Sequence, residues 1–420
     1  MAINPSDHTV TAAPAAGGYR LAFILVTSLF FMWGLSYGLL DVLNKHFQET
    51  LNVTRARSAL LQGAYFGAYF LMALPAALLM QRRGYKTGIL LGLGLFAAGA
   101  LLFVPATSAG QFEFYLFALF VIACGLACLE TAANPYITVL GPAATSERRL
   151  NLSQSFNGLG AFIAPLIGGK LFFGTAGSGI SGTHGVQMTY VAIAGIVLLI
   201  ALLIWRTAMP DIREQDADAG AGTSPARPLL RQKHFVYAVV AQFFYVAAQV
   251  GVGAFFINYA TEHAAGMSSE HAAYLLSIAL GCFLAGRFLG TALMGTIAPA
   301  RLLTVYAVVN VLLCGLVMAG QGWASIIGLI AMFFFMSIMF PTIFALGVKD
   351  LGAQTKRGAS FIIMAIVGGA IMPWFMGRIA DASGDTAAAF SIPAICFAIV
   401  ALYGAFGQRA DRSASARDGR

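Results

Sequence analysis

The chain has 420 residues, of which 59% are hydrophobic and only 10% are charged. A soluble domain carries about 25% charged residues, so this composition excludes a soluble globular protein and predicts a membrane protein. The net charge of +8 does not indicate binding to nucleic acid, because the basic residues gather between apolar segments, as they do in membrane proteins.

Long apolar segments recur along the whole chain. About 20 helical residues span the hydrocarbon core of a bilayer, which makes each such segment a candidate span. We expect spans at residues 21–43, 57–80, 86–105, 114–140, 150–173, 188–208, 234–259, 271–296, 301–320, 323–347, 357–380 and 387–408. The sequence therefore predicts an all-α membrane protein with twelve transmembrane helices.

The positions of Lys and Arg predict the orientation. When both termini are cytoplasmic, 19 of the 25 basic residues fall on the cytoplasmic side, as the positive-inside rule requires. Residues 1–19 lack a basic stretch before the first span and contain Asp7, so they are typical of a disordered cytoplasmic tail and not of a cleavable signal peptide. Residues 409–420 form the second predicted cytoplasmic tail.

The first span contains Trp33 and Asp41. Counted from Leu21, Asp41 lies about 30 Å along a helix, near the outer surface, unless the helix starts lower, tilts, or breaks at Gly34 and Gly38. The carboxyl is then either a functional group or the polar end of a surface helix. Trp33 either lines a cavity or fills the interior of the bundle.

The fourth span carries Glu130 in the string Cys-Leu-Glu-Thr-Ala-Ala-Asn-Pro-Tyr at residues 128–136. Glu130 lies 11 residues before Gly141, roughly 16 Å into the membrane at 1.5 Å per residue, which is the midplane. A charged residue there costs about 2.5 to 3.5 kcal/mol, so it needs a reason. Either a donor on a neighbouring helix pairs with it, or it exchanges protons in a cavity. We also expect a helix break at Pro135, with a counterpart at Pro341.

Amide side chains line one face of the fifth span. Asn151, Gln154 and Asn157 recur at three-residue spacing, and Asn157 lies about 12 Å beyond Arg149. Amides offer both donors and acceptors, which suits the hydroxyl groups of a sugar, and they cost less to bury than charges. Hydrogen bonding between helices is the alternative interpretation.

A hydrophilic stretch, residues 210–232, divides the spans six and six and has the composition of a flexible linker. The pattern Arg149, Pro165 and Lys170 recurs 208 residues later as Arg357, Pro373 and Arg378. We therefore expect two related six-helix bundles, residues 20–209 and 233–408, with a substrate site between them, as in many transporters.

The seventh span presents Gln242, Tyr245 and Gln249 on one helical face, because they are three and four residues apart. Amides beside an aromatic ring suit a pyranose sugar, while ordinary helix contacts also explain the tyrosine. We predict no metal or cofactor site: the five cysteines lie within spans without ligand spacing, and the six histidines are scattered over tail, loops and helix ends. The absence of an acid, base or metal constellation also argues against a membrane-embedded enzyme.

Several strings resemble the fucose:proton symporter family, a branch of the major facilitator superfamily. They are Phe-Phe-Met-Trp-Gly at 30–34 followed by Asp41, the Glu130 string at 128–136, Val-Leu-Gly-Pro at 139–142, Arg-Leu-Asn-Leu-Ser-Gln-Ser-Phe-Asn at 149–157, and Phe-Pro-Thr-Ile-Phe-Ala-Leu-Gly at 340–347. The resemblance implies two pseudo-symmetric six-helix bundles around a polar cavity. It also implies proton coupling by Asp41 and Glu130 and sugar binding by Gln154 and Asn157.

Gly38 departs from this pattern, because the resemblance implies a further cavity asparagine there in fucose-transporting members of the family. We expect that difference to bear on the choice between L-fucose and glucose, galactose or an amino sugar. The sequence as a whole predicts a proton-coupled monosaccharide importer in the bacterial inner membrane, acting as a monomer. The second hypothesis is a proton-coupled exporter of drug-like amphipathic molecules, which the many phenylalanines and small residues permit.

Overall fold

The computed structural model describes residues 16–139, 146–173, 182–207, 228–349, 351 and 355–407. The tail predicted at 409–420 and most of the tail predicted at 1–19 lie outside the described residues, and so does the predicted linker except for residues 228–232. Residues 16–19, which the sequence assigns to the tail, form the start of the first helix. The predicted domain boundaries therefore stay predictions.

All secondary-structure elements of the described residues are helices, as predicted. An N-terminal half contains α1 (Ala16–Leu51), α2 (Arg55–Ser58), α3 (Leu60–Arg83), α4 (Tyr85–Leu101), α5 (Phe103–Ala109), α6 (Phe112–Val139), α7 (Ser146–Phe173) and α8 (Thr183–Arg206). A C-terminal half contains η3 (Leu229–Arg231), α9 (Lys233–Ala254), α10 (Phe256–His263), α11 (Ser269–Leu293), α12 (Pro299–Met318), α13 (Trp323–Met336), α14 (Met339–Val348), α15 (Thr355–Met364), η5 (Ala365–Val367), α16 (Gly368–Ser383), α17 (Thr386–Ala389) and α18 (Ser391–Phe406).

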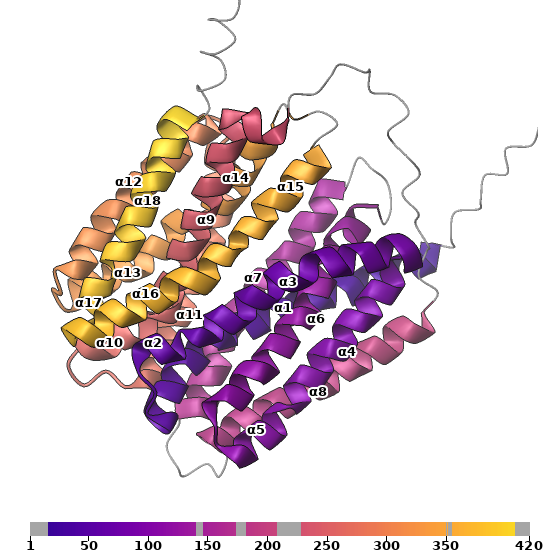
Figure 1. Ribbon diagram of the computed structural model, residues 1–420, viewed down its shortest axis with the longest axis horizontal. Coiled ribbons are helices and arrows are strands. Elements are labelled where there is room, and N and C mark those ends of the chain that lie inside the picture. Colours follow the sequence, from indigo (N-terminus) through magenta and orange to yellow (C-terminus); the bar gives the residue numbers. More distant parts are fainter. Residues whose placement is uncertain are drawn as a thin grey trace, which may run out of the picture.

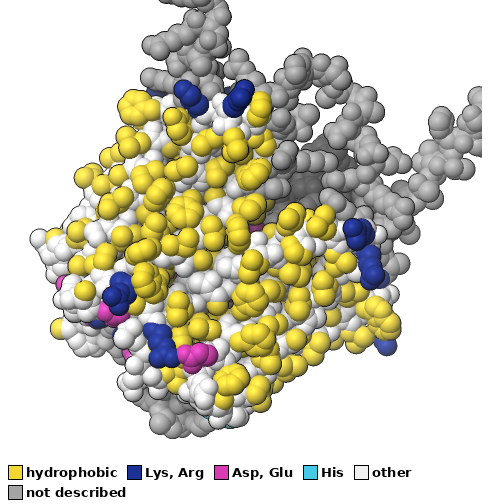
Figure 2. All heavy atoms as spheres, viewed as in Figure 1, with side chains coloured by type: hydrophobic (Ala, Val, Ile, Leu, Met, Phe, Trp, Pro, Cys, Tyr) yellow, Lys and Arg dark blue, Asp and Glu magenta, His cyan; other side chains and the backbone are white. Residues whose placement is uncertain are grey.

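Twelve segments of these helices are long and apolar enough to cross a membrane, which confirms the predicted number of spans. Large apolar side chains such as Leu74 and Leu312 stay 68% exposed. Figure 2 shows this hydrophobic surface between two ends where basic side chains gather. A surface of this kind needs a lipid environment, because an exposed apolar area this large is rare on soluble proteins.

The first span is eight residues longer than predicted and ends at Leu51 instead of residue 43. The predicted end falls just before the polar residues Asn44, Lys45 and His46, but neighbouring groups satisfy or bury them inside the protein. The Asn44 amide donates to the Ala254 carbonyl at 2.5 Å, Lys45 pairs with Glu49 at 3.6 Å, and His46 is fully buried among aromatic rings. Asp41 is therefore ten residues from the end of its helix and is not a surface terminus.

The predicted helix breaks are only partly present. The tenth span is interrupted between α13 and α14 at Ser337 and Ile338, because Pro341 lacks the N–H that would bond to the Ser337 carbonyl four residues earlier. The eleventh span is interrupted by η5, directly before Gly368. In contrast, α6 continues through Pro135 to Val139, and Pro165 and Pro373 lie inside continuous helices.

Within the N-terminal half, α1 and α7 cross unusually closely. A Cβ atom at Gly34 would lie 1.9 Å from the Asn157 carbonyl oxygen, and one at Gly160 would lie 2.2 Å from the Phe31 carbonyl oxygen. The glycines that the sequence analysis considered as break points therefore allow two backbones to touch, and α1 itself is unbroken. This crossing fixes Asn157 and the fifth span against the helix that carries Trp33 and Asp41.

The two halves are joined firmly at one end of the molecule. We call this the closed end, and it consists of residues 44–56 together with the residues of the C-terminal half that they contact. The α7 helix lies against α11, and α2 and α3 lie against α16. From the closed end, α15 and the helices of the N-terminal half diverge toward the opposite, open end (Figure 1). The starts of α1 and α9 and the ends of α8 and α18 belong to the open end.

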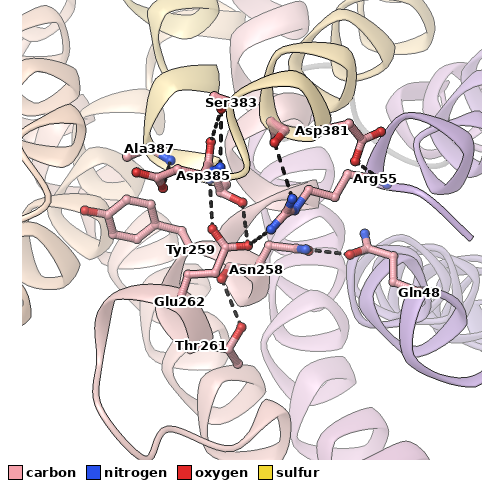
Figure 3. A network of polar contacts seen from close by, with 12 residues as sticks. Gln48, Arg55, Asn258, Tyr259, Thr261, Glu262, Asp381, Ser383, Asp385 and Ala387 are labelled. Carbon is pink, nitrogen blue, oxygen red and sulfur yellow. Dashed lines mark hydrogen bonds and ion pairs between the residues drawn. The ribbon is translucent and has the colours of Figure 1, made fainter. Parts of the chain in front are cut away.

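Charged groups hold the closed end together (Figure 3). Asp381 of α16 accepts the backbone N–H groups of Arg55 and Ala56, at 3.0 and 2.9 Å, and so caps the first turn of α2 from the other half. The Arg55 guanidinium donates to Glu262, whose carboxylate also accepts the Thr386 N–H at 2.8 Å. An anionic group at a helix N-terminus is stabilising, so the cap that Asp381 places on α2 favours the joined arrangement. The Arg55–Glu262 ion pair also crosses between the halves, whereas the bond from Thr386 to Glu262 lies within the C-terminal half.

Candidate functional site

Glu130 lines a pocket within the N-terminal half, together with residues of α1. The pocket is bordered by Leu29, Phe30, Trp33, Leu129, Glu130 and Ala133. Glu130 and Trp33 are both partly exposed, whereas their apolar neighbours on the two helices are mostly buried. The structure thus brings together the carboxyl and the tryptophan that the sequence singled out, beside a small space between α1 and α6.

Two tyrosines of α3 approach the same carboxyl. Tyr65 and Tyr69 are electrostatic neighbours of Glu130, and their ring centroids are 5.4 Å apart. They are four residues apart and therefore share one face of α3. Neither tyrosine was predicted from the sequence, although the spacing that selected Gln242, Tyr245 and Gln249 applies equally to this pair.

Gln154 and Asn157 both link α7 to its neighbours. The Gln154 side chain donates to the Asn134 side-chain oxygen of α6 at 3.3 Å, and the Asn157 side chain donates to the Phe30 carbonyl of α1 at 3.2 Å. Each amide is partly exposed and uses one donor in these bonds, so acceptor capacity remains for a ligand. The two interpretations from the sequence, helix linking and sugar binding, are therefore compatible at these positions.

Asp41 lies eight residues beyond Trp33 on α1, about 12 Å along the helix axis, and only 3% of it is exposed. Its neighbours are Tyr37 on the same helix, and Gln62 and Tyr65 on α3. From the C-terminal half, Gly253 touches its carboxyl group. Asp41 and Glu130 therefore share Tyr65 as a common neighbour, but Asp41 is covered by the other half and Glu130 is not.

The three predicted residues of α9 have different surroundings. Tyr245 is fully buried and donates to the Met336 carbonyl at 2.9 Å, which favours the structural interpretation of its hydroxyl group. Gln242 is also fully buried, and neither its amide nitrogen nor its amide oxygen has a hydrogen-bond partner in the described part of the chain. Gln249 is partly exposed. In this conformation a ligand can reach Gln249, whereas the amide of Gln242 is covered.

Tyr37 of α1 connects this face of α9 to the N-terminal half, whereas Arg287 of α11 lies in the same half as α9. Neither residue was placed in the site from the sequence. Tyr37 is a neighbour of both Asp41 and Tyr245, and Arg287 of α11 is a neighbour of Tyr245. The guanidinium carbon of Arg287 lies 5.1 Å from the centre of the Phe283 ring. Tyr37 stands in the run that contains Asp41, so its position one helical turn before the acid was the available signal.

Gly38 faces α7 and does not line the pocket. A Cβ atom there would lie 2.6 Å from the Ala164 Cβ and 2.7 Å from the Ala161 carbonyl oxygen. The absence of a side chain at this position lets α1 and α7 approach each other closely. Any effect of Gly38 on the choice of sugar is therefore indirect in this conformation.

The arrangement combines two carboxyl groups, several amides and aromatic rings in the interior of a membrane protein. Carboxyl groups in such a place bind and release protons, while amides and ring faces bind neutral polar molecules. Groups from both halves contribute, and they lie between the closed end and the open end. A site at the interface of two repeated bundles is the arrangement expected for a transporter with alternating access.

Comparison with known proteins gives similarities along nearly the whole chain. The profile of the Major Facilitator Superfamily matches residues 21–369. The L-fucose-proton symporter of Escherichia coli (strain K12) is 40% identical over 408 residues, covering 92% of this chain and 93% of that protein. The glucose/galactose transporter of Brucella abortus biovar 1 (strain 9-941) is 36% identical and covers 96% of this chain and 97% of its own.

The structure is also similar to a solved one. The E. coli Fucose:proton symporter, whose crystal structure is described as an outward conformation, aligns with a TM-score of 0.67 at 39% identity. The alignment covers 93% of this chain and 99% of that chain. Sequence and structure therefore give the same relative.

Proposed function

Since this chain belongs to the major facilitator superfamily, we propose that it is a proton-coupled symporter that imports a monosaccharide, L-fucose or a related hexose, by alternating access. The observation that carries the proposal is the pocket of Glu130 and Trp33, flanked by Gln154 and Asn157. The 40% identity to an L-fucose-proton symporter supports protons and sugar as the transported species. The similarity to a glucose/galactose transporter keeps those hexoses among the candidates.

We further propose that the open end faces the cytoplasm of a bacterial cell across its inner membrane, and that the monomer is the working unit. Arg82, Arg83, Lys86 and Arg206 belong to the ends of α3, α4 and α8 at the open end, where the positive-inside rule expects basic residues. The present structure then corresponds to an inward-facing protein. The TM-score of 0.67 to the outward structure, at 39% identity, agrees with a different placement of the halves.

In the proposed cycle, Asp41 and Glu130 take up protons when the site faces outward. The sugar then contacts Trp33, Gln154 and Asn157 of one half, and Gln242, Tyr245 and Gln249 of the other. Neutral carboxyl groups are cheaper to bury than carboxylates, so the protonated, sugar-loaded protein closes over the site more readily. A ligand shifts the equilibrium between two conformations only through its different affinity for each, and the protons supply that difference.

Reconstituted vesicles test this function directly. Labelled hexoses, deoxyhexoses and N-acetylhexosamines are supplied with and without an inward proton gradient. We expect one sugar to accumulate above its outside concentration only with the gradient, and that sugar to drive proton uptake. A chain that moves none of these sugars in either condition is not a monosaccharide symporter.

The same vesicles separate the second hypothesis, an exporter of amphipathic molecules. A panel of hydrophobic cations is offered to vesicles in both orientations. Exchange of those cations for protons, together with no response to any sugar, would favour the exporter. The partly exposed amides of Gln154 and Asn157 favour the sugar, because an amide offers both donors and acceptors to hydroxyl groups, whereas a quaternary hydrophobic cation can use neither.

A further inference from the structure

One face of α1 forms a continuous seam with the C-terminal half at the closed end. Asp41, Asn44 and Gln48 are three and four residues apart and so share this face. Opposite them, Gly253 touches Asp41, the Ala254 carbonyl accepts from the Asn44 amide at 2.5 Å, and the Asn258 amide donates to Gln48 at 2.5 Å. The seam therefore leads from the outermost amide pair inward to the carboxyl group of Asp41.

Gly253 lies directly against the carboxyl group of Asp41 in this seam. A Cβ atom at this position would lie 2.7 Å from Oδ2 of Asp41 and 3.3 Å from its Cγ. The contact lies next to the point where α9 ends at Ala254 and α10 begins at Phe256, so the backbone turns here. Because glycine has no side chain, the two halves approach until only 3% of Asp41 is exposed.

The groups around Asp41 offer little to balance a negative charge. Its own helix contributes Tyr37, α3 contributes Gln62 and Tyr65, and the C-terminal half contributes the uncharged backbone of Gly253. Lys45, the basic residue one turn further along α1, pairs with Glu49. A carboxylate sealed beneath Gly253 therefore lacks a cationic partner, whereas a neutral carboxyl group fits at lower cost.

We propose that Gly253 is a positioning residue that makes closure of the protein depend on Asp41. Because Gly253 has no side chain, the closed end can seal over the carboxyl group of Asp41 when that group is neutral. The proposal rests on the proposed function, in which the two halves alternate. Gly253 does not bind the sugar or the proton. Its role is to set how closely the C-terminal half approaches the acid.

A buried cysteine reports closure without any substrate. Ala59 is fully buried and packs with Ala254 and Phe255 of the other half, so Ala59→Cys is shielded when the end is closed. The five native cysteines are replaced by serine, and the purified protein in detergent is labelled with a maleimide. We expect Gly253→Ala to raise the labelling rate about tenfold, because an overpacked contact destabilises the closed state by an amount that corresponds to about that factor. Gly253→Val should raise the labelling rate further.

Gly315→Ala is the matched control, because that helical glycine of α12 has open space where a Cβ would stand. We expect it to label at the parent rate. Asp41→Ala in the Gly253→Ala background should return labelling toward the parent rate, since it removes the carboxyl group that the new methyl group meets. Equal labelling of Gly253→Ala and its parent, or no rescue by Asp41→Ala, would overturn the proposal.

The charge of Asp41 is tested in the same assay by changing pH. At each pH, we take the ratio of the labelling rate of the parent to that of Asp41→Asn. This ratio should rise as pH rises, because the carboxylate opposes closure. The ratio cancels the reactivity of the thiol itself. A ratio that stays flat would refute the dependence on Asp41. These measurements need no sugar, so a failure of sugar transport in the parent protein would count against the proposed function alone.

Discussion

Asp41 and Glu130 are both acids of the N-terminal half, yet their surroundings differ. Asp41 is sealed by the other half at Gly253, and Glu130 remains partly exposed in its pocket beside Trp33. The two acids could not be separated from the sequence, because depth counted along a helix says nothing about which half covers a side chain. Because Tyr65 is an electrostatic neighbour of both acids, protonation of one changes the electrostatic surroundings that it shares with the other.

Neutralising either acid should uncouple sugar from protons. We expect Glu130→Gln and Asp41→Asn to lose accumulation against a gradient, because neither amide exchanges a proton, while exchange of labelled for unlabelled sugar persists at least in part. Uptake into vesicles with and without a proton gradient measures both quantities. Full accumulation by both variants would remove these residues from the coupling role.

Asn157 combines a structural and a binding role in this structure. We expect Asn157→Ala to weaken sugar binding about tenfold, as loss of one neutral hydrogen bond of about 1 kcal/mol or more implies. Calorimetry gives the dissociation constant, and a thermal melt of the same sample gives stability. A lower melting temperature with an unchanged dissociation constant would leave Asn157 with only its bond to the Phe30 carbonyl.

Apolar runs were enough to predict every span, because a helix needs about 20 apolar residues wherever it crosses the membrane. The ends of the helices were harder to predict. Asn44, Lys45 and His46 read as the end of a span, but a contact with α9, a pair along the helix and surrounding aromatic rings keep them inside it. Pro135 read as a break, but α6 continues through it.

The crossing of α1 and α7 predicts a severe effect of a single methyl group. In Gly34→Ala the new Cβ would lie 1.9 Å from the Asn157 carbonyl oxygen, which is backbone and cannot rotate away. We expect a loss of about 3 kcal/mol or more of stability, at the upper end for overpacking, with a lower melting temperature in detergent. Gly94→Ala is the control, because its Cβ would meet nothing within 4 Å.

At the scale of the whole molecule, the internal repeat of 208 residues indicated two halves, but it did not indicate which end would be closed. Closure depends on pairs such as Gln48 with Asn258 and Arg55 with Glu262, which lie more than 200 residues apart and have no spacing rule to reveal them. The same sequence must also support the opposite arrangement if the halves alternate, so its patterns do not specify one conformation.

Asp381 offers a test of this closed end, with Asp385 as a matched control in the same half. Asp381 caps α2 across the interface through the N–H groups of Arg55 and Ala56, whereas Asp385 caps α17 through the Ala387 N–H at 2.8 Å, within the C-terminal half. Losing an N-cap costs about 1 kcal/mol, so both substitutions lower stability by similar amounts.

Only Asp381→Ala should also move the equilibrium between conformations, because only Asp381 joins the two halves. We expect labelling of the Ala59→Cys reporter to rise about fivefold in Asp381→Ala and to stay at the parent rate in Asp385→Ala, since about 1 kcal/mol corresponds to that factor. If both variants label alike, the cap on α2 adds to stability without holding the end closed. The remaining contacts, Arg55 with Glu262 and the seam along α1, would then carry closure on their own.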